Sequence, residues 1–142
     1  SSTFWSDRIG PTAAIATLNL MQKEKSWLKI TNIGKKIKKN WKKIAEENKI
    51  KICIQGIDAL PNFYFNHNYN QITKFFLTQE MLKKRILANF SIYCAIYHTG
   101  KILSIYFDII NYIFYRIKKN NLKKQMIKLI KQKMIKKLKI TI

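Results

Sequence analysis

The sequence has few of the residues that build metal sites and disulfide frameworks. Its two cysteines, Cys53 and Cys94, lie far apart, and its two histidines, His67 and His98, have no ligand-like spacing to them. No CxxC pair is present, so a zinc site is not expected. Both cysteines lie in alternating apolar runs, where a buried free thiol is the commoner outcome. Free thiols suit a reducing cytoplasm, and we expect a cytoplasmic protein.

A long uninterrupted apolar stretch is also lacking. The longest one, from Ile102 to Ile117, contains Asp108 and Asn111 and is shorter than the ~20 residues that a bilayer span needs. We therefore expect no transmembrane segment. The opening residues 1–5 contain neither an initiator Met nor the basic-then-apolar pattern of a signal peptide. This start predicts that the chain continues a longer protein.

Arginine is scarce, although the chain carries a net charge of +21. Such a charge would attract nucleic acids or anionic membranes through counterion release. However, only three of the 28 basic residues are Arg, so 25 are Lys, and they accompany abundant Ile and Asn. These three residue types have A/T-rich codons, so biased source DNA would produce the excess without a partner. Because bidentate Arg is the usual reader of bases and phosphates, we expect no specific nucleic-acid partner. A basic nucleic-acid-binding module stays open as an alternative function.

The residues that are present can supply one globular core, with 47% hydrophobic and 13% aromatic content over 142 residues. Gly10 and Pro11 open a predicted helix that runs to Met21, and its small residues would allow very close packing against a neighbour. A second helix is predicted from Ser26, which can serve as its N-cap. Its lysines lie on a solvated face, opposite a core-facing stripe of Ile30, Ile33, Ile37, Trp41 and Ile44.

The apolar period changes from helical to alternating at Ile50. Strands are predicted at 50–55, 60–65 and 91–97, all in one sheet. Helical spacing returns in two further segments, and Thr99 can cap the second of them. The inward positions are predicted to be Ile72, Phe75, Phe76, Met81, Leu82 and Ile86 in the first, and Ile102, Tyr106, Ile109, Ile110, Ile113 and Ile117 in the second. This order predicts an α+β fold in which a small, mostly antiparallel sheet is covered by helices.

The last segment, residues 119–142, is a lysine-rich amphipathic tail. A basic amphipathic helix of this kind could lie on an anionic membrane surface or bind an acidic partner. A chain rich in Lys and Ile also generates such a pattern readily. The tail is therefore interpreted either as a membrane-surface element, which is a further alternative function, or as an extension without a role.

The segment STFWSDRIGPTAA, residues 2–14, resembles a motif of pyridoxal-phosphate-dependent class III aminotransferases related to glutamate-1-semialdehyde aminomutase. Dispersed matches in the same order extend the resemblance over roughly residues 1–118. They are Ser26-Trp27, Gly34-Lys35, Trp41, Gly56, Leu60-Pro61, Phe63, Thr78-Gln79-Glu80-Met81-Leu82 and His98-Thr99.

The resemblance implies the C-terminal part of a fold-type I transferase. Residues 1–22 would be the distal end of the large cofactor-binding domain, and residues 23–118 the small C-terminal α+β domain. In this family the enzyme is a homodimer, and the Ser-Thr pair lies at the subunit interface. Carried over by position, Thr3 is the candidate ligand of the phosphate of pyridoxal 5'-phosphate in the partner subunit, with Ser2 beside it.

The resemblance also implies what the chain lacks. The family's catalytic Lys lies upstream of the Ser-Thr motif, so no residue here is predicted to be catalytic, and the chain alone is expected to be inactive. Aminomutases carry a Glu before their His-Thr pair, whereas residues 89–99 contain none. The expected reaction, transfer of an amino group from an amine donor to a carbonyl acceptor, thus stays open between aminotransferase and aminomutase.

Overall fold

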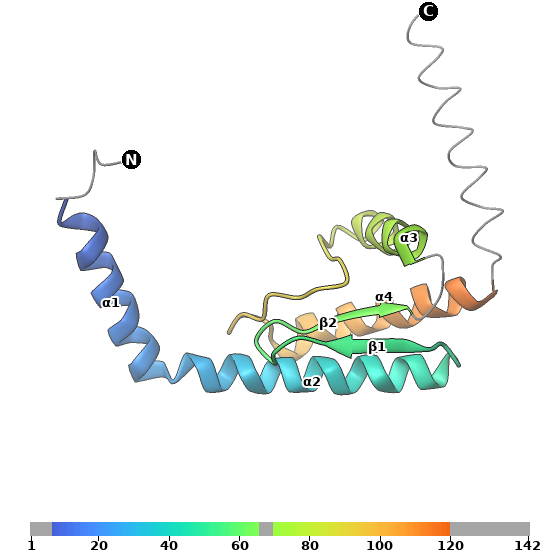
Figure 1. The fold of residues 1–142 in the computed structure, drawn as a ribbon, viewed down its shortest axis with the longest axis horizontal. Coiled ribbons are helices and arrows are strands. Elements are labelled where there is room, and N and C mark those ends of the chain that lie inside the picture. The colour runs from blue at the N-terminus through green and yellow to red at the C-terminus, as the bar shows by residue number, and fades with distance from the viewer. Residues whose placement is uncertain (1–6, 66–69, 120–142) are drawn as a thin grey trace, which may run out of the picture.

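The computed structural model describes residues 7–65 and 70–119, in which four helices and one two-stranded antiparallel sheet form (Figure 1). This confirms the predicted α+β class. Three of the helices and the sheet enclose a common core, whereas the first helix extends away from it. The elements are α1 (Ile9–Glu24), α2 (Ser26–Glu47), β1 (Ile52–Gln55), β2 (Asn62–Phe65), α3 (Asn70–Lys83) and α4 (Gly100–Lys119).

Helix α2 presents most of its predicted apolar stripe to the core, but Ile30 is only partly buried and lies outside the core cluster. Ile37, Trp41 and Ile44 are buried, while most lysines between them face solvent. The prediction that Ser26 caps this helix is wrong. The capping position is taken by Lys25, whose left-handed backbone (φ 48°) both ends α1 and begins α2. With a single residue joining the two helices, Ser26 is already helical, and its buried hydroxyl makes no hydrogen bond within the described residues.

Strands β1 and β2 form a hairpin at the two sites where the alternating pattern predicted strands. Ile52 pairs with Phe65 and Gln55 with Asn62. The connecting turn begins at Gly56, whose φ of +83° suits glycine, and a Cβ there would lie 2.4 Å from the Leu60 carbonyl oxygen.

The prediction of a third strand at 91–97 is wrong. In this segment only Ser91 forms a bridge, to Asn62. The backbone of residues 90–94 runs antiparallel beside residues 59–63, through the Phe63 N–H to the Phe90 carbonyl (2.9 Å), the Ile92 N–H to the Pro61 carbonyl (3.0 Å) and the Cys94 N–H to the Ala59 carbonyl (3.0 Å). Most of its partners belong to the turn before β2, so a regular ladder does not develop.

Five aromatic rings form the centre of the core. Phe63 lies in contact with Trp41, Phe65, Phe90 and Phe114, with ring centroids 4.7 to 5.7 Å apart. These rings come from α2, β2, the 90–94 segment and α4. They therefore join α2, α4 and the 90–94 segment to β2 in one packed unit.

Helix α4 follows Thr99, whose carbonyl accepts the Leu103 N–H at 2.9 Å, as expected of a helix N-cap residue. Tyr106, Ile110 and Ile113 are buried as predicted, and Ile109 and Ile117 are partly buried. The prediction for Ile102 is wrong, because it is 50% exposed and Leu103 enters the core instead.

Helix α3 buries Phe76 and Met81 as predicted, and Ile86 beyond its end is partly buried. Phe75 and Leu82 face outward instead, with exposed fractions of 40% and 46%, and Leu77 takes an inward position. The side chain of Ile72 lies outside the described part of the chain.

Helix α1 leaves this unit almost at once (Figure 1). It contains no buried residue, and it contacts the rest of the described chain at the start of α2. The close packing that its small residues predicted is therefore not made within the described residues.

Candidate functional site

The residues predicted to bind the cofactor phosphate, Ser2 and Thr3, lie outside the described residues. The described chain begins just after them, where the carboxylate of Asp7 accepts the N–H of Ile9 at 3.1 Å. The predicted domain boundary at 22–23 falls within the last turn of α1, next to the Lys25 joint.

Helix α1 presents apolar side chains on two opposite sides. At 100° per residue, Ile9 and Leu20 share one side with Ala13 and Ala16, while Ile15 and Leu18 lie nearly opposite. All four large residues are at least 60% exposed. A helix that is apolar on more than one side is typical of a buried position in a larger body.

A mainly apolar cavity of about 330 Å³ lies between residues 86–93 and the first turns of α4. His98 is its single imidazole, and none of its lining residues carries an acidic, Lys or Arg side chain. The lining consists of Ile86, Leu87, Ala88, Ser91, Ile92, Tyr93, His98, Ile102, Leu103 and Tyr106. The cavity was not predicted from the sequence, where His98 stood out only through the His-Thr resemblance.

The orientation of His98 is set by a tight local turn. The Ala95 carbonyl accepts the His98 N–H at 3.0 Å, and the Ala95 N–H donates to Nδ1 of the imidazole at 3.2 Å. An Nδ1 that accepts a hydrogen bond is unprotonated, so the ring proton is on Nε2. Nε2–H has no hydrogen-bond partner among the described residues and remains a free donor.

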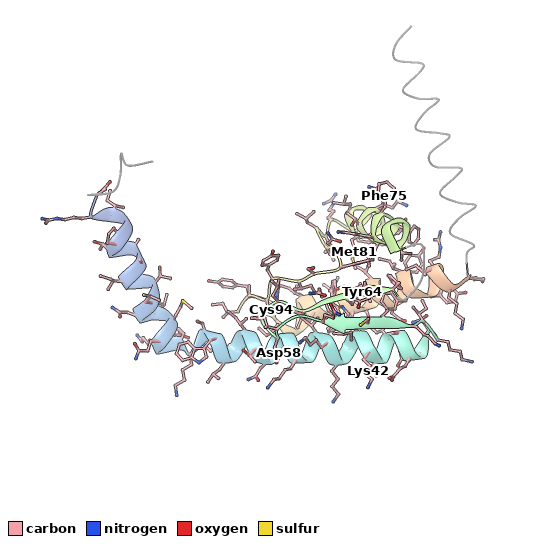
Figure 2. All side chains as sticks on the ribbon, viewed as in Figure 1. Lys42, Asp58, Tyr64, Phe75, Met81 and Cys94 are labelled. Atoms are coloured by element: carbon pink, nitrogen blue, oxygen red, sulfur yellow. The ribbon has the colours of Figure 1, made fainter. Side chains whose placement is uncertain are left out.

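Both cysteines are free, but they are half-buried rather than buried as predicted. Figure 2 shows Cys94 close to Asp58, whose carbonyl oxygen lies 3.6 Å from Sγ. Burial raises the pKa of the Cys94 thiol, and the Asp58 carboxylate acts in the same direction. Cys53 lies beside Tyr64, and their hydrogen bond raises the pKa of the Tyr64 hydroxyl. Residues 7–65 and 70–119 contain no group of three or more side chains arranged to hold a metal ion.

Five of the six lysines predicted on the solvated face of α2 are exposed. Lys42, labelled in Figure 2, is exposed and lines a surface pocket together with Ile52 and Ile54 of β1. Lys38 differs, because its half-buried Nζ reaches the Asp58 carboxylate at 2.8 Å and the Gly56 carbonyl at 2.7 Å. It ties α2 to the hairpin turn and is not available to an anion. The exposed face consists of Lys35, Lys36, Lys39, Lys42 and Lys43.

No helix in the described part of the chain is both long enough and apolar enough to cross a membrane. Comparisons with protein-family models, with curated proteins and with solved structures find no match to this chain. The resemblance to class III aminotransferases therefore rests on the motifs of the sequence itself.

Proposed function

We propose that the chain is the C-terminal part of a cytoplasmic, homodimeric, pyridoxal-phosphate-dependent class III aminotransferase or aminomutase. Residues 1–22 would complete the large domain, and residues 23–118 would form the small domain that closes over the substrate. The observation that carries the proposal is α1, which is apolar on two sides, buries nothing, and is joined through Lys25 alone to a unit with its own core.

The free energy that burial of these apolar side chains would provide supports a further part of the protein packed around α1. Burying one Leu or Ile side chain stabilises a protein by about 1.5–3 kcal/mol. Ile9, Ile15, Leu18 and Leu20 are 60–74% exposed, so covering them would together contribute about two thirds of the full value, or roughly 4–8 kcal/mol. That is comparable to the total stability of a typical domain. A helix with this composition is favoured where protein covers both of its sides, as in the interior of a large domain.

The described residues alone do not fit a cofactor site. The one cavity described above has no Lys in its lining and no acidic residue to pair with a pyridine nitrogen. In the proposed enzyme the hydroxyls of Thr3 and Ser2 would hold the phosphate, and the catalytic Lys would come from the preceding part of the protein. When bound, pyridoxal phosphate supplies the chemistry that stores the amino group between donor and acceptor.

The role of Thr3 can be tested in the complete enzyme. Thr3→Ala should weaken cofactor binding by roughly 1.5–3 kcal/mol, the range for a hydrogen bond to a charged group, because one phosphate donor is lost. Equilibrium dialysis of pyridoxal phosphate measures the change, and circular dichroism checks that the fold is intact. Unchanged affinity would exclude Thr3 as a phosphate ligand.

A mixed dimer tests whether Thr3 acts across the interface. One subunit carries Thr3→Ala, and the other keeps Thr3 but lacks the catalytic Lys. The only Lys-bearing site then belongs to the Thr3→Ala subunit and receives its Thr from the partner, so it should retain cofactor normally. If the mixed dimer loses cofactor as readily as the Thr3→Ala homodimer, Thr3 does not bind the phosphate across the subunit interface.

The exposed lysine face of α2 favours a second candidate, weak polyanion binding. Dispersed Lys provides charge without the Arg and aromatic groups that discriminate between sequences, so binding to DNA should be weak, salt-dependent and independent of sequence. Tight, sequence-discriminating binding at physiological salt would instead support a nucleic-acid-binding module. The membrane-surface alternative concerns the tail, and vesicle binding by residues 119–142 would test it; residues 120–142 lie outside the described residues.

A further inference from the structure

The cavity beside α4 has a mainly apolar lining to which His98 adds an imidazole, and Ser91, Tyr93 and Tyr106 add hydroxyl groups. His98 provides Nε2–H, which has no partner among the described residues, while branched aliphatic side chains line most of the remaining wall. Its volume of about 330 Å³ is at the lower end of the range for small-molecule sites. We propose that this cavity binds a small carboxylate with an apolar body, of the arylacetate or branched-alkyl acid class.

The Nε2–H donor of His98 and the positive charge of the chain determine the polar end of such a ligand. Nε2–H needs an acceptor, and a carboxylate oxygen is a stronger acceptor than a neutral carbonyl. The lining contains no acidic side chain that would repel an anion. The chain's net charge of +21 also raises the local concentration of anions.

The apolar end follows from the cavity rim. Leu87, Tyr93 and Ile102 line the cavity and are 88%, 79% and 50% exposed. A hydrocarbon or aryl group seated among them would remove apolar surface from water, which a bare carboxylate cannot do. The site thus selects against acetate and in favour of larger acids.

This inference does not rest on the proposed aminotransferase function. All of the lining residues lie between Ile86 and Tyr106, within the described unit. The 142-residue chain can therefore be tested as it is, and the cavity can bind an acid whether or not the cofactor assignment holds.

The direct test is a titration of the isotopically labelled chain with phenylacetate, followed by two-dimensional NMR. Amide shifts should concentrate at Ala88, Ser91, Ile92 and His98, with those of the α2 lysine face nearly unchanged. Acetate, which lacks the ring, and phenylacetamide, which lacks the charge, should each bind about tenfold more weakly. Equal binding of phenylacetamide, or shifts spread over the α2 lysines, would overturn the proposal.

Variants separate the donor from the cavity. His98→Leu should weaken phenylacetate binding about tenfold, because the carboxylate loses a charge-assisted hydrogen bond. His98→Gln should retain most of the affinity, since its amide can accept from Ala95 and donate to the ligand. Ala88→Leu should block binding by filling the cavity, whereas Ile15→Ala on α1 should leave it unchanged.

If a cavity variant fails to fold, the titrations of the wild-type chain with phenylacetate, acetate and phenylacetamide still test the proposed site. Unchanged binding in a folded His98→Leu or Ala88→Leu protein would contradict the site. An affinity for His98→Gln as low as that for His98→Leu would also contradict the role of Nε2–H, provided that both spectra show the native fold.

Discussion

The hydroxyl of Tyr106 is enclosed between α2 and α4, where it accepts the indole N–H of Trp41 at 3.0 Å. Burial raises the pKa of Tyr106 well above its ordinary value, while the hydrogen bond from Trp41 acts in the opposite direction. The side chain is 6% exposed, so desolvation is the larger effect. The folded protein thus keeps this phenol neutral under conditions in which the unfolded chain ionises it.

This difference predicts a loss of stability at alkaline pH. The unfolded-state pKa is near 10, and the folded-state pKa is higher. The stability that depends on neutral Tyr106 is therefore complete below about pH 10 and declines as pH rises further. Tyr106→Phe should cost about 1–3 kcal/mol at neutral pH, because the Trp41 N–H loses its acceptor, but its unfolding free energy should fall less steeply above pH 10.

Urea unfolding between about pH 8 and pH 11 measures this slope. Ile44→Val is a suitable control, since it costs a similar core penalty of about 1 kcal/mol but leaves Tyr106 in place. It should keep the wild-type pH dependence. A Tyr106→Phe protein with the same alkaline slope as the wild type would show that Tyr106 does not contribute to it.

At the scale of elements, α2 and the hairpin turn lie very close together. A Cβ added to Gly34 would lie 1.5 Å from the backbone oxygen of Asp58. One helical turn later, Lys38 bonds to the same turn through Asp58 and Gly56. Glycine at position 34 thus sets the distance at which the lysine can reach its partners.

Gly34→Ala should therefore destabilise the protein by about 3 kcal/mol, because backbone rather than a flexible side chain must move. Thermal or urea unfolding measures the effect. Gly10→Ala is the matched control, since a Cβ there meets nothing within 4 Å. It should be neutral or stabilising by up to about 1 kcal/mol. Similar unfolding midpoints for the two variants would refute the close contact.

Periodicity predicted α2, α4 and the hairpin well, because each of these elements has one buried face. Ile37, Trp41 and Ile44 were identified by helical spacing, and β1 by its alternation. Residues 90–94, at the start of the third predicted strand, also alternate in burial, with Phe90 buried and Ser91 exposed, but a strand requires a partner ladder. The partner here is mostly a turn, and no local pattern reveals that.

The candidate site was much less predictable than the fold. The cavity gathers residues from 86–93, His98 and the start of α4, and their approach depends on tertiary packing. The helical spacing also predicted the wrong inward residue in the first turn of α4, since Leu103 rather than Ile102 enters the core. Thr3 and Ser2 came from the resemblance alone, and their role stays a prediction.

At the scale of the whole molecule, the uncovered α1 distinguishes the isolated chain from the proposed complete enzyme. Leu18→Ala should change the unfolding free energy of the isolated chain by less than about 0.5 kcal/mol, because Leu18 is 63% exposed. In the complete enzyme the same substitution should cost about 2–5 kcal/mol, as expected for a buried leucine. Denaturant unfolding of both proteins provides the comparison.

Leu103→Ala is the control. Leu103 is buried within the chain itself, so this substitution should destabilise both proteins. If Leu18→Ala leaves the complete enzyme as stable as the wild type, α1 is not covered by the rest of that protein. A large effect in the isolated chain would show that α1 packs on the described unit in solution.

The bond between Trp41 and Tyr106 joins residues 65 positions apart, and this separation has a consequence during synthesis. Ribosomes add about 5–20 residues per second, so α2 emerges roughly 3–13 s before the α4 residues that cover it. The β1–β2 hairpin can form early, because its contacts are local. Over those seconds Phe63 of β2 can already cover one side of Trp41, but the part of the α2 stripe that packs on α4 stays open to water on the nascent chain.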